Sequence, residues 1–365
     1  MRVHYLLAVE PSRVEVALKV GVLTGGGDCP GLNAVIRAIA RKGIIRYGYV
    51  IYGIYNGWKG LMQEGLVRPL DLADTSGILP RGGTILKTSR TNPFKIDGGQ
   101  EKVLENLKKN NIQALIAVGG DDTLNVAAKL YELGIKVVGV PKTIDNDIFG
   151  TDRTFGFDTA VNIATEAIDR LHTTAESHNR VMVVEVMGRH TGWIAIESGL
   201  AGGADMILIP EKPANLDEVC TLIKRRHERG KDFSIVVVAE GVKIKTPEHP
   251  EGMVVIQDGS VDEFGHVRLG GVGNFVAQEI EKRLGFESRV VVLGHIQRGG
   301  SPTAFDRNLG TRYGLYAIDL VHQGKFGYFA ALRGSDIVAV SLSEMAGKTR
   351  TVDDDFYRMA EVFFG

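Results

Sequence analysis

Seven short runs of aliphatic residues recur along the chain, and each is followed by glycine or an acidic residue and then by a segment with helical spacing. Runs of this length are typical of strands buried on both faces of a parallel sheet. Because ligands of such sheets bind beyond the carboxyl ends of the strands, functional groups are expected just after each run. The predicted strands are 18–23, 50–54, 114–118, 137–140, 181–186, 235–239 and 290–293.

Apolar residues at helical spacing separate these runs. Val126, Leu130 and Leu133 fall on one helix face, and Gly134 follows them as a C-terminal cap. The alternation predicts an α/β fold with mainly parallel sheets covered by helices on both faces. A second stripe of the same kind consists of Ala160, Ala164, Ala167, Ile168 and Leu171.

The chain length of 365 residues suits about two domains. The sequence contains no tandem repeat, low-complexity tract or linker rich in proline and serine, so a second domain must interleave with the first through ordinary loops. We expect the break near Phe157. The predicted architecture is therefore two interleaved Rossmann-like three-layer domains.

Charge and cysteine content narrow the class of protein. Lys and Arg total 43 against 44 Asp and Glu, which gives a formal net charge of -1, and neither sign forms a long run. We expect no nucleic-acid or membrane partner, so an anionic ligand must meet locally placed arginine and lysine. With only Cys29 and Cys220, the composition favours a reducing cytoplasm over a disulfide framework.

The start of the chain is expected to be an N-terminal extension, 1–15. Its longest apolar run, 3–9, is interrupted by His4 and is far shorter than the roughly 20 residues of a membrane span. A signal peptide is the weaker interpretation of this segment.

Glycines crowd the junction between the first predicted strand and the helix that begins near Leu32, in the stretch GGGDCPG at 25–31. Glycines let the backbone approach an anion closely, and a helix N-terminus directs free N–H groups and a positive dipole end towards it. A tight strand-to-helix turn explains the stretch equally well.

Adjacent acids, Asp121 and Asp122, follow the strand 114–118 at the start of a helix. Acidic residues stabilise a helix N-terminus, so capping is one explanation. A bound Mg²⁺ is the sharper one, because this ion prefers one or two carboxylates together with phosphate oxygens and water.

Two further acids, Asp145 and Asp147, follow the strand 137–140. Alternation in an extended loop would place both on the same side, as a general base and a metal-organising or orienting partner require. A solvated turn rich in Asp and Asn is the alternative.

Six well-separated motifs follow one another along the chain. They are GGGDCPGLN at 25–33, RGGTILKTSR at 81–90, GGDD at 119–122, PKTIDND at 141–147, SHNRVMVVEVMGRHTG at 177–192 and LGHIQRGGSP at 293–302. In this order they resemble the motifs of the 6-phosphofructokinase family, and the resemblance covers nearly all of the chain from about residue 20. It implies the phosphofructokinase fold and an enzyme that uses Mg²⁺ to transfer a phosphoryl group to the 1-hydroxyl of fructose 6-phosphate.

The resemblance assigns the chemistry to residues that follow predicted strands. Asp145 is expected to take the proton from the sugar hydroxyl, with Thr143 and Asp147 beside that hydroxyl and the transferred group. Arg189 would neutralise charge on the group in flight, and Asp121 would hold Mg²⁺.

Phosphate and sugar contacts are implied in the same way. Gly27 and Arg90 would contact the donor phosphates. Arg180 and Arg289 would reach the 6-phosphate from a neighbouring subunit, which implies a homo-oligomer, a dimer or tetramer, with shared sites. Isolated arginines are also often surface ion-pair partners, and Met187 could simply pack in the core. His295 and Arg298 would bind the same 6-phosphate. The implied acceptor contacts are Thr143, Asp145, Arg180, Met187, Gly188, Arg189, Glu240, Arg289, His295 and Arg298.

The implied domains divide these roles. A phosphoryl-donor and Mg²⁺ domain would comprise 16–157 with about 297–345. A fructose 6-phosphate domain would comprise 158–296, and 346–365 would be a C-terminal tail.

Two positions bear on the phosphoryl donor, which in this family is ATP or inorganic pyrophosphate. Asp122 and Lys142 stand where ATP-using members of the best-known type have glycine. Side chains there would fill the space of the nucleotide α-phosphate, Asp122 would repel it, and Lys142 would supply positive charge to pyrophosphate. A local ion pair between the two would leave the donor open. Trp58, where the family often has an aromatic residue near the adenine, could point to ATP or to nothing.

The pyrophosphate-dependent enzyme, running in both directions in glycolysis or gluconeogenesis, is the main hypothesis. The alternatives are an ATP-dependent 6-phosphofructokinase and a noncatalytic sugar-phosphate sensor, although a sensor is expected to have lost the base. Lipid and NAD kinases share a GGD strand end but do not account for TIDND and GHIQRGG. Arg37 and Arg41 match effector-binding positions, but His172 replaces a further arginine, which weakens the expectation of allosteric control.

Overall fold

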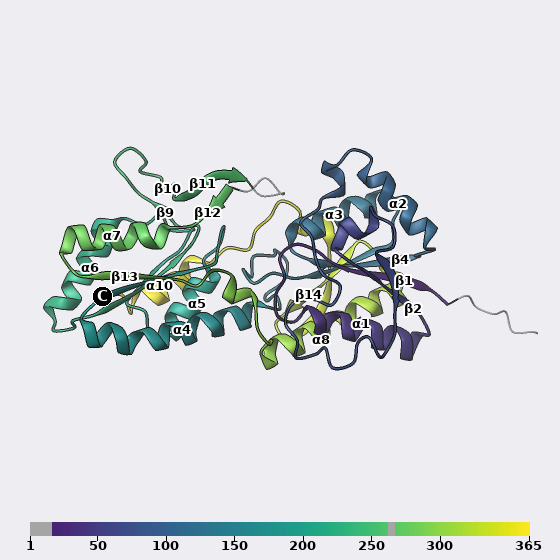
Figure 1. Cartoon of the computed structure of the whole chain (residues 1–365), viewed down its shortest axis with the longest axis horizontal. Coiled ribbons are helices and arrows are strands. Elements are labelled where there is room, and N and C mark those ends of the chain that lie inside the picture. The colour runs from purple at the N-terminus through teal and green to yellow at the C-terminus, as the bar shows by residue number, and fades with distance from the viewer. Residues whose placement is uncertain (1–16, 262–266) are drawn as a thin grey trace, which may run out of the picture.

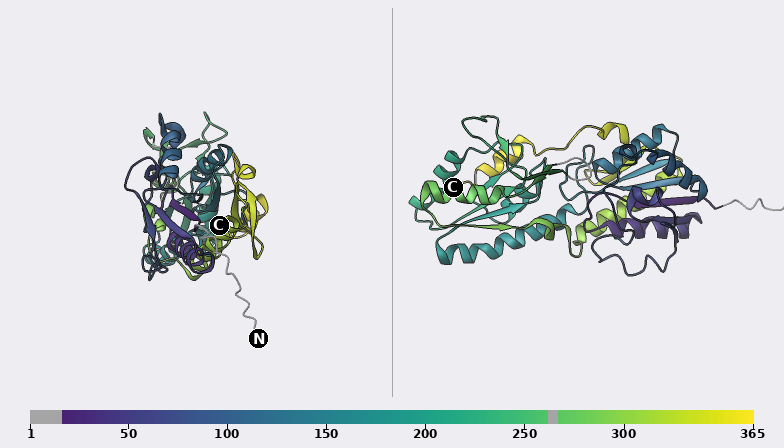
Figure 2. Two further views of the ribbon diagram at one scale, coloured as in Figure 1. Left: turned by 90° about the vertical axis from the view of Figure 1, so that its right-hand side faces the viewer. Right: turned by 45° about the horizontal axis from the view of Figure 1, so that its top comes forward.

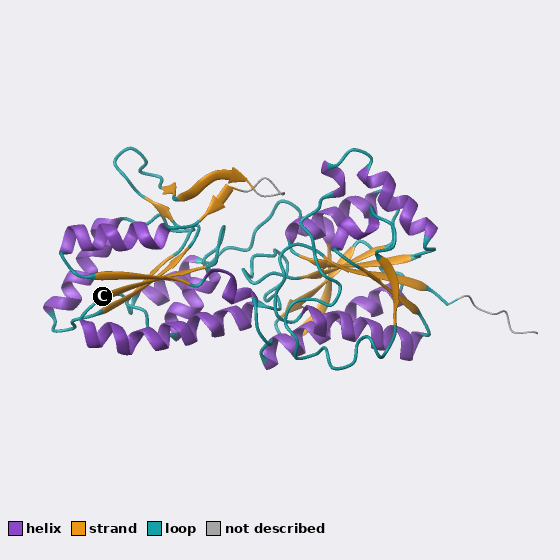
Figure 3. Ribbon diagram, viewed as in Figure 1, coloured by secondary structure: helices purple, strands orange, loops and turns teal. Residues whose placement is uncertain are grey.

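In the computed structural model, residues 17–261 and 267–365 are described, and they form two lobes that lie side by side (Figure 1). The predicted extension, 1–15, falls outside the described residues. Each lobe is a sheet with helices against both faces (Figure 3). All seven predicted runs form strands, so the α/β fold with mainly parallel sheets is confirmed.

The larger sheet has seven strands, and those at its centre are parallel. Its order is β15 (Asp336–Ser341), β14 (Tyr328–Arg333), β5 (Val137–Pro141), β4 (Ala114–Gly119), β1 (Lys19–Thr24), β2 (Val50–Ile54) and β3 (Val67–Leu70). The outer strands β3 and β15 pair antiparallel to their neighbours.

Helices on the two faces of this sheet bury different sets of strand residues. On one face, Val20 and Val22 pack with α1 (Leu32–Tyr47) and α8 (Ala304–His322). On the other, Leu115 and Ala117 pack with α3 (Asp121–Glu132). This alternation follows from the period of two along a strand. Helix α2 (Gly99–Lys109) and the short α9 (Leu342–Met345) complete the second face, with 3₁₀ helices at Gly57–Leu61 and Pro93–Lys95.

The strand order places two loops together. Strand β1 lies between β2 and β4, so the chain leaves β1 in one direction and later returns on its other side. The loops after β1 and β4 therefore flank a switch point, where open α/β sheets bind ligands. These are the glycine loop 25–31 and the Gly-Gly-Asp segment that opens α3.

The smaller sheet has four strands, all parallel, in the order β13 (Ser288–Val292), β6 (Val181–Val186), β8 (Ser234–Ala239) and β7 (Met206–Leu208). Helices α4 (Phe157–His178) and α5 (Trp193–Ala201) cover one face, and α6 (Leu216–Glu228) and α7 (Val272–Leu284) cover the other (Figure 1). Two small hairpins, Lys243–Ile244 with Met253–Val254 and Ile256–Val261 with Val267–Leu269, precede α7.

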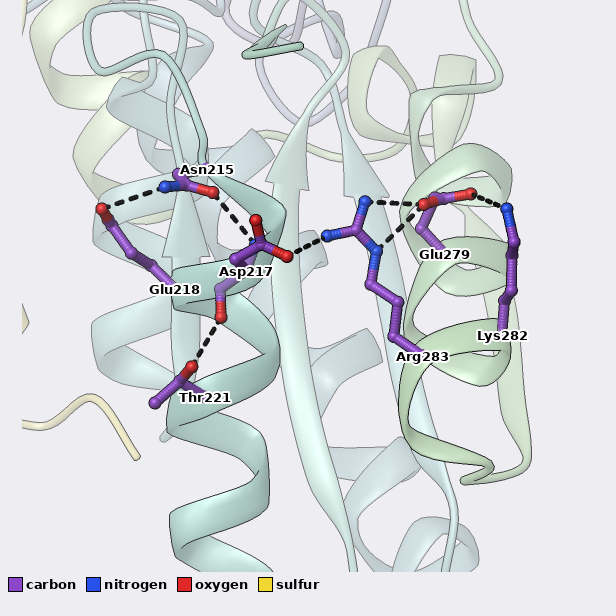
Figure 4. A network of polar contacts seen from close by, with 7 residues as sticks. All are labelled: Asn215, Asp217, Glu218, Thr221, Glu279, Lys282 and Arg283. Carbon is purple, nitrogen blue, oxygen red and sulfur yellow. Dashed lines mark hydrogen bonds and ion pairs between the residues drawn. The ribbon is translucent and has the colours of Figure 1, made fainter. Parts of the chain in front are cut away.

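A polar network joins α6 and α7 at the surface (Figure 4). Asn215 caps α6 by accepting a hydrogen bond from the Asp217 amide at 3.0 Å. Arg283 of α7 donates to Asp217 across the helices and to Glu279 one turn before it, at 2.6 and 2.7 Å. Exposed pairs of this kind contribute little to stability, about 0 to 1 kcal/mol each.

One helix end differs from its prediction. Helix α3 ends at Glu132, and Leu133 is 52% exposed instead of sharing the buried face of Val126 and Leu130. The amide of Ile135 donates back to the carbonyl of Leu130, and Gly134 takes a left-handed φ of 86°. This closing turn rotates Leu133 outward.

The chain passes between the lobes three times, by way of α4, through the segment between β13 and α8, and after α9 (Figures 1 and 2). The last passage carries the predicted C-terminal tail, 346–365, back to the smaller lobe. There α10 (Asp354–Glu361) packs against α5, with Phe356 stacked on Trp193. We keep the domain boundaries near 157 and 297 as a proposal.

Candidate active site

The glycine loop after β1 is built by two glycines in left-handed conformations. Gly26 has φ 79°, and Gly31, at the N-terminus of α1, has φ 106°. Side chains other than glycine rarely adopt these angles, so the loop requires glycine there. The first turn of α1 then directs its unsatisfied N–H groups towards the loop, which suits an anion.

A second loop, 81–90, is fastened against the first. Asn33, in α1, donates to the carbonyl of Arg81 at 3.0 Å and accepts from the amide of Ile85 at 2.9 Å. The amide of Gly26 donates to the carbonyl of Ser89 at 3.0 Å. These bonds hold Arg90, the next residue along, beside the glycine loop. Sequence reasoning assigned no role to Asn33, although it closes the GGGDCPGLN motif.

Lys142 enters the same loop from the end of β5. Its side chain is buried, and its ammonium donates a hydrogen bond to the carbonyl of Gly27. The ammonium nitrogen lies 3.4 Å from where a Cβ on Gly26 would stand. Burial, the largest effect, lowers the pKa of Lys142. The half-buried glycine loop thus has a buried ammonium next to the backbone that would approach donor phosphates.

Three acids meet beside this cation. Asp121 opens α3, while Asp145 and Asp147 lie in the loop after β5. Desolvation, with the charges of Asp145 and Asp121, raises the pKa of Asp147 to about 7. Among the described residues, none donates a hydrogen bond to the buried Oδ1 of Asp145. Crowded, partly unsatisfied carboxylates of this kind suit a cation.

The described residues contain no cluster of three or more side chains that could hold a metal ion by themselves. One or two carboxylates combined with ligand phosphate oxygens and water are the arrangement that Mg²⁺ prefers. One or two of these acids, completed by phosphate oxygens and water, fit that ion.

The loop itself is not extended as predicted. Asn146 has φ 55°, and the chain bends at Ile144 and Asp145. The bend is held because the carboxamide of Asn146 accepts from the amide of Thr154 at 3.0 Å. The amide of Asp145 also donates to the hydroxyl of Thr143 at 3.0 Å. The charge of Asp145 still helps to raise the pKa of Asp147, but the two acids are joined by a turn instead of strand alternation.

The smaller sheet contributes its own strand ends. Met187, Gly188 and Arg189 follow β6, and Glu240 follows β8. Desolvation and the charge of Asp145 raise the pKa of Glu240 to about 7, against the opposing effect of Arg189. The charges of Asp145 and Arg189 therefore act on one half-buried carboxyl. The hydroxyl of Thr191, after β6, donates to the carbonyl of Asp145 at 3.3 Å, so the loops after β6 and β5 meet.

Gln297 and Arg298, in the 3₁₀ helix Gly294–Arg298, connect these groups to the glycine loop. The buried Gln297 accepts from the amide of Met187 at 3.3 Å, a role that the sequence did not suggest. Arg298 donates to the carbonyl of Asp28 at 3.4 Å, and its Nη1 lies 2.6 Å from where a Cβ on Gly27 would stand. His295 is exposed on the same short helix. Arg298 thus contacts the predicted donor loop, although the resemblance assigned it to the acceptor phosphate.

Comparison with known proteins shows the family to which a chain of this architecture belongs. A family model described as phosphofructokinase matches residues 19–321. The chain belongs to the phosphofructokinase family. A pyrophosphate--fructose 6-phosphate 1-phosphotransferase of Amycolatopsis mediterranei (strain S699) is 60% identical over 349 residues, which are 95% of this chain and all of that protein.

Other relatives carry a different donor in their names. An ATP-dependent 6-phosphofructokinase of Mycobacterium tuberculosis (strain ATCC 25618 / H37Rv) is 51% identical over 95% of this chain and all of that protein. The phosphofructokinase of Pichia pastoris in the T-state superposes with a TM-score of 0.79 at 31% identity. That match covers 99% of this chain and 38% of the other. The phosphofructokinase fold is therefore confirmed.

Two arginines of the phosphofructokinase pattern lie away from the other predicted site residues. Arg180 and Arg289 stand at the amino-terminal side of β6 and β13, whereas Arg189 and Arg298 follow the carboxyl ends. Both arginines contact Glu287, Arg180 at 2.8 Å. Within one chain they are not brought to the glycine loop.

The side chains that bear on donor choice are also placed. Asp122 lies in the first turn of α3, and Lys142 is directed at Gly27 as described above. Trp58 is 1% exposed and packs in the core with Leu61, so it does not line an open nucleotide site.

No helix among the described residues is long and apolar enough to cross a membrane.

Proposed function

We propose that this chain transfers a phosphoryl group from inorganic pyrophosphate to the 1-hydroxyl of fructose 6-phosphate, with Mg²⁺, giving fructose 1,6-bisphosphate and phosphate. The observation that carries the choice of donor is the buried Lys142 ammonium on the carbonyl of Gly27. It adds positive charge where a donor without a nucleoside needs it, and it occupies space that an α-phosphate would require.

In this mechanism the Asp145 carboxylate removes the proton from the sugar hydroxyl. The freed oxygen lone pair forms a bond to phosphorus, and the bond between that phosphorus and the bridging oxygen of pyrophosphate breaks, releasing phosphate. Arg189, whose charge acts with that of Asp145 on Glu240, stabilises the charge on the group in flight. Catalysis of this kind depends mainly on positioning and electrostatic stabilisation.

The remaining residues bind the substrates. The backbone at Gly27, with Arg90 and Lys142, binds the donor. Thr143 and Asp147 flank the sugar hydroxyl and the transferred group, and Met187, Gly188 and Glu240 contact the sugar. Asp121 would hold Mg²⁺, whose charge would stabilise the phosphate oxygens. The acceptor phosphate is bound by His295 and by Arg298, which also contacts the glycine loop at Asp28, and is completed by Arg180 and Arg289 of a second subunit.

The proposal also covers the assembly, the location and the reversibility of the enzyme. The enzyme is a homo-oligomer with shared sites, located in the cytoplasm. Its reaction runs in both directions, because the free energy of hydrolysis of pyrophosphate lies closer to that of the product ester than the free energy of hydrolysis of ATP does.

The test is the initial rate of fructose 1,6-bisphosphate formation from fructose 6-phosphate and Mg²⁺, with pyrophosphate and with ATP in parallel. We expect activity with pyrophosphate and little with ATP. Activity with ATP alone would keep the family and overturn the donor, and inactivity with both would support the sensor.

A further inference from the structure

The segment that follows α9 runs along the loop that bears Asp145 and Asp147. The backbone amide of Arg350 donates to the carbonyl of Asp147 at 2.8 Å, and its guanidinium donates to the carbonyl of Asn146 at 3.2 Å. Thr349 pairs with Ile148 in an antiparallel bridge. The predicted tail is therefore bonded directly to the candidate catalytic loop.

The same segment is fixed to the smaller lobe. The carbonyl of Arg350 accepts from the indole N–H of Trp193 at 2.9 Å, and its guanidinium lies 4.0 Å from the centre of that ring. The Glu211 carboxylate accepts from the amides of Val352 and of Gly192, each at 3.0 Å. Arg350 and Glu211 thus tie the loop after β5 to the start of α5, which follows Arg189.

The guanidinium of Arg350 donates its hydrogen bond to a residue in an unfavourable backbone conformation. Asn146 is the residue with the left-handed φ of 55° between the two acids. Residues other than glycine adopt this conformation at a cost and keep it where the surroundings hold them. Thr154 holds the carboxamide of Asn146, and Arg350 holds its carbonyl, so the peptide is gripped on both sides.

We propose that Arg350 is a positioning residue for phosphoryl transfer, which fixes the peptide between Asp145 and Asp147 and couples it to the loop that carries Arg189. This inference rests on the proposed function, because it assumes that these acids act in the reaction. Arg350 acts through the loop and contacts no reacting atom.

The test compares kcat and KM for three variants with the unchanged chain. Arg350→Ala removes the guanidinium, Arg350→Lys keeps a cation but not the planar fork, and Arg358→Ala is the control. Arg358 lies on α10 in the same segment, is 69% exposed at its side chain and pairs with Asp355 at 3.9 Å. It makes no contact described above with the catalytic loop or α5.

We expect Arg350→Ala to lower kcat on the order of 10- to 100-fold, because misplacement of reacting groups by about 1 Å can cost about 100-fold. The KM values for pyrophosphate and fructose 6-phosphate should change by less than about threefold, since the lost bond serves orientation and not binding. Arg350→Lys should fall between, and Arg358→Ala should match the unchanged chain. Low, non-denaturing guanidinium should restore part of the kcat of Arg350→Ala.

Three results would overturn the inference. One is a kcat for Arg350→Ala within twofold of the unchanged chain, or for Arg350→Lys if the alanine variant does not fold. Another is a kcat loss that follows a lowered Tm, with no rescue by guanidinium, because that pattern indicates a purely structural role. Inactivity of the unchanged chain with both donors would remove the proposed function itself, whereas activity with ATP alone would leave Arg350 measurable with that donor.

Discussion

Lys142 carries a cation into a part of the protein from which water is largely excluded, and its ammonium donates to the carbonyl of Gly27. Burial lowers its pKa because the charged form loses hydration. A bound anion would offset this cost, because its negative charge stabilises the charged ammonium. At the scale of single residues, the glycine loop therefore favours an anionic ligand more strongly than its glycines alone would indicate.

Asp145 is the residue on which the proposed chemistry depends most. Its Oδ1 is buried and accepts no hydrogen bond from any described residue, which leaves the atom available to a proton or a cation. We expect Asp145→Asn to lower kcat by roughly 10²- to 10⁴-fold, the usual contribution of a general base. The measurement is the rate at saturating substrates, with Asp97→Asn, an exposed acid, as control. A near-normal rate for Asp145→Asn would exclude it as the base.

Asp147 makes a pH-dependent contribution to stability. Desolvation and its acidic neighbours raise its pKa from 3.8 to about 7, so between these values the folded protein holds a proton that the unfolded chain has lost. Its contribution to the free energy of unfolding therefore falls as pH rises from about 4 through 7.

Asp147→Asn removes that ionisation, so the variant should gain Tm over the unchanged chain, and gain more at about pH 8 than at about pH 5. Thermal unfolding without Mg²⁺, in the presence of a chelator, measures this. Equal differences in Tm at the two pH values would show that Asp147 is not held protonated by its surroundings. Activity should be lost in the same variant.

At the scale of elements, aliphatic runs and glycine-rich strand ends could be predicted because they obey local rules of burial and backbone freedom. Strand β7 has three residues, and the edge strand β3 contains Pro69, so neither shows a period that the sequence could reveal. Both are strands because they pair with a neighbour already in place.

The residues of the candidate site also fall into two groups, those that local sequence could predict and those that it could not. Asp121, Asp145 and Glu240 follow predicted strands and could be placed from them. The turn at Asn146 could not, because it depends on Thr154 and on Arg350, which is 204 residues further along the chain. Local sequence cannot reveal a contact between residues so far apart in the chain. The hydrogen bond between Met187 and Gln297 could not be predicted for the same reason.

At the scale of the whole molecule, the position of two arginines indicates how sites are assembled. Arg180 and Arg289 lie at the opposite end of the smaller sheet from Arg189, so they can serve a site only if another subunit presents them. Closed symmetric assembly would make each such contact reciprocal.

Mixed oligomers test this arrangement. Arg289→Ala and Asp145→Asn subunits are each expected to be nearly inactive alone. Coexpression should restore about a quarter of the normal activity in a dimer, since half of the dimers are hybrids with one intact site of two. After purification through a tag on each subunit, which selects the hybrids, about half of the normal activity is expected, and this measurement decides the matter. No recovery in confirmed hybrids would mean that each site is complete within one chain.

The central claim, that this phosphofructokinase uses pyrophosphate because of the side chains around its glycine loop, is tested by one ratio. It is kcat/KM for pyrophosphate divided by kcat/KM for ATP, measured in the unchanged chain and in the double variant Asp122→Gly with Lys142→Gly. The account predicts a ratio well above one that falls at least about tenfold in the double variant, as charge and space at the loop are removed. A ratio below one in the unchanged chain, or the same ratio in both proteins, would contradict it.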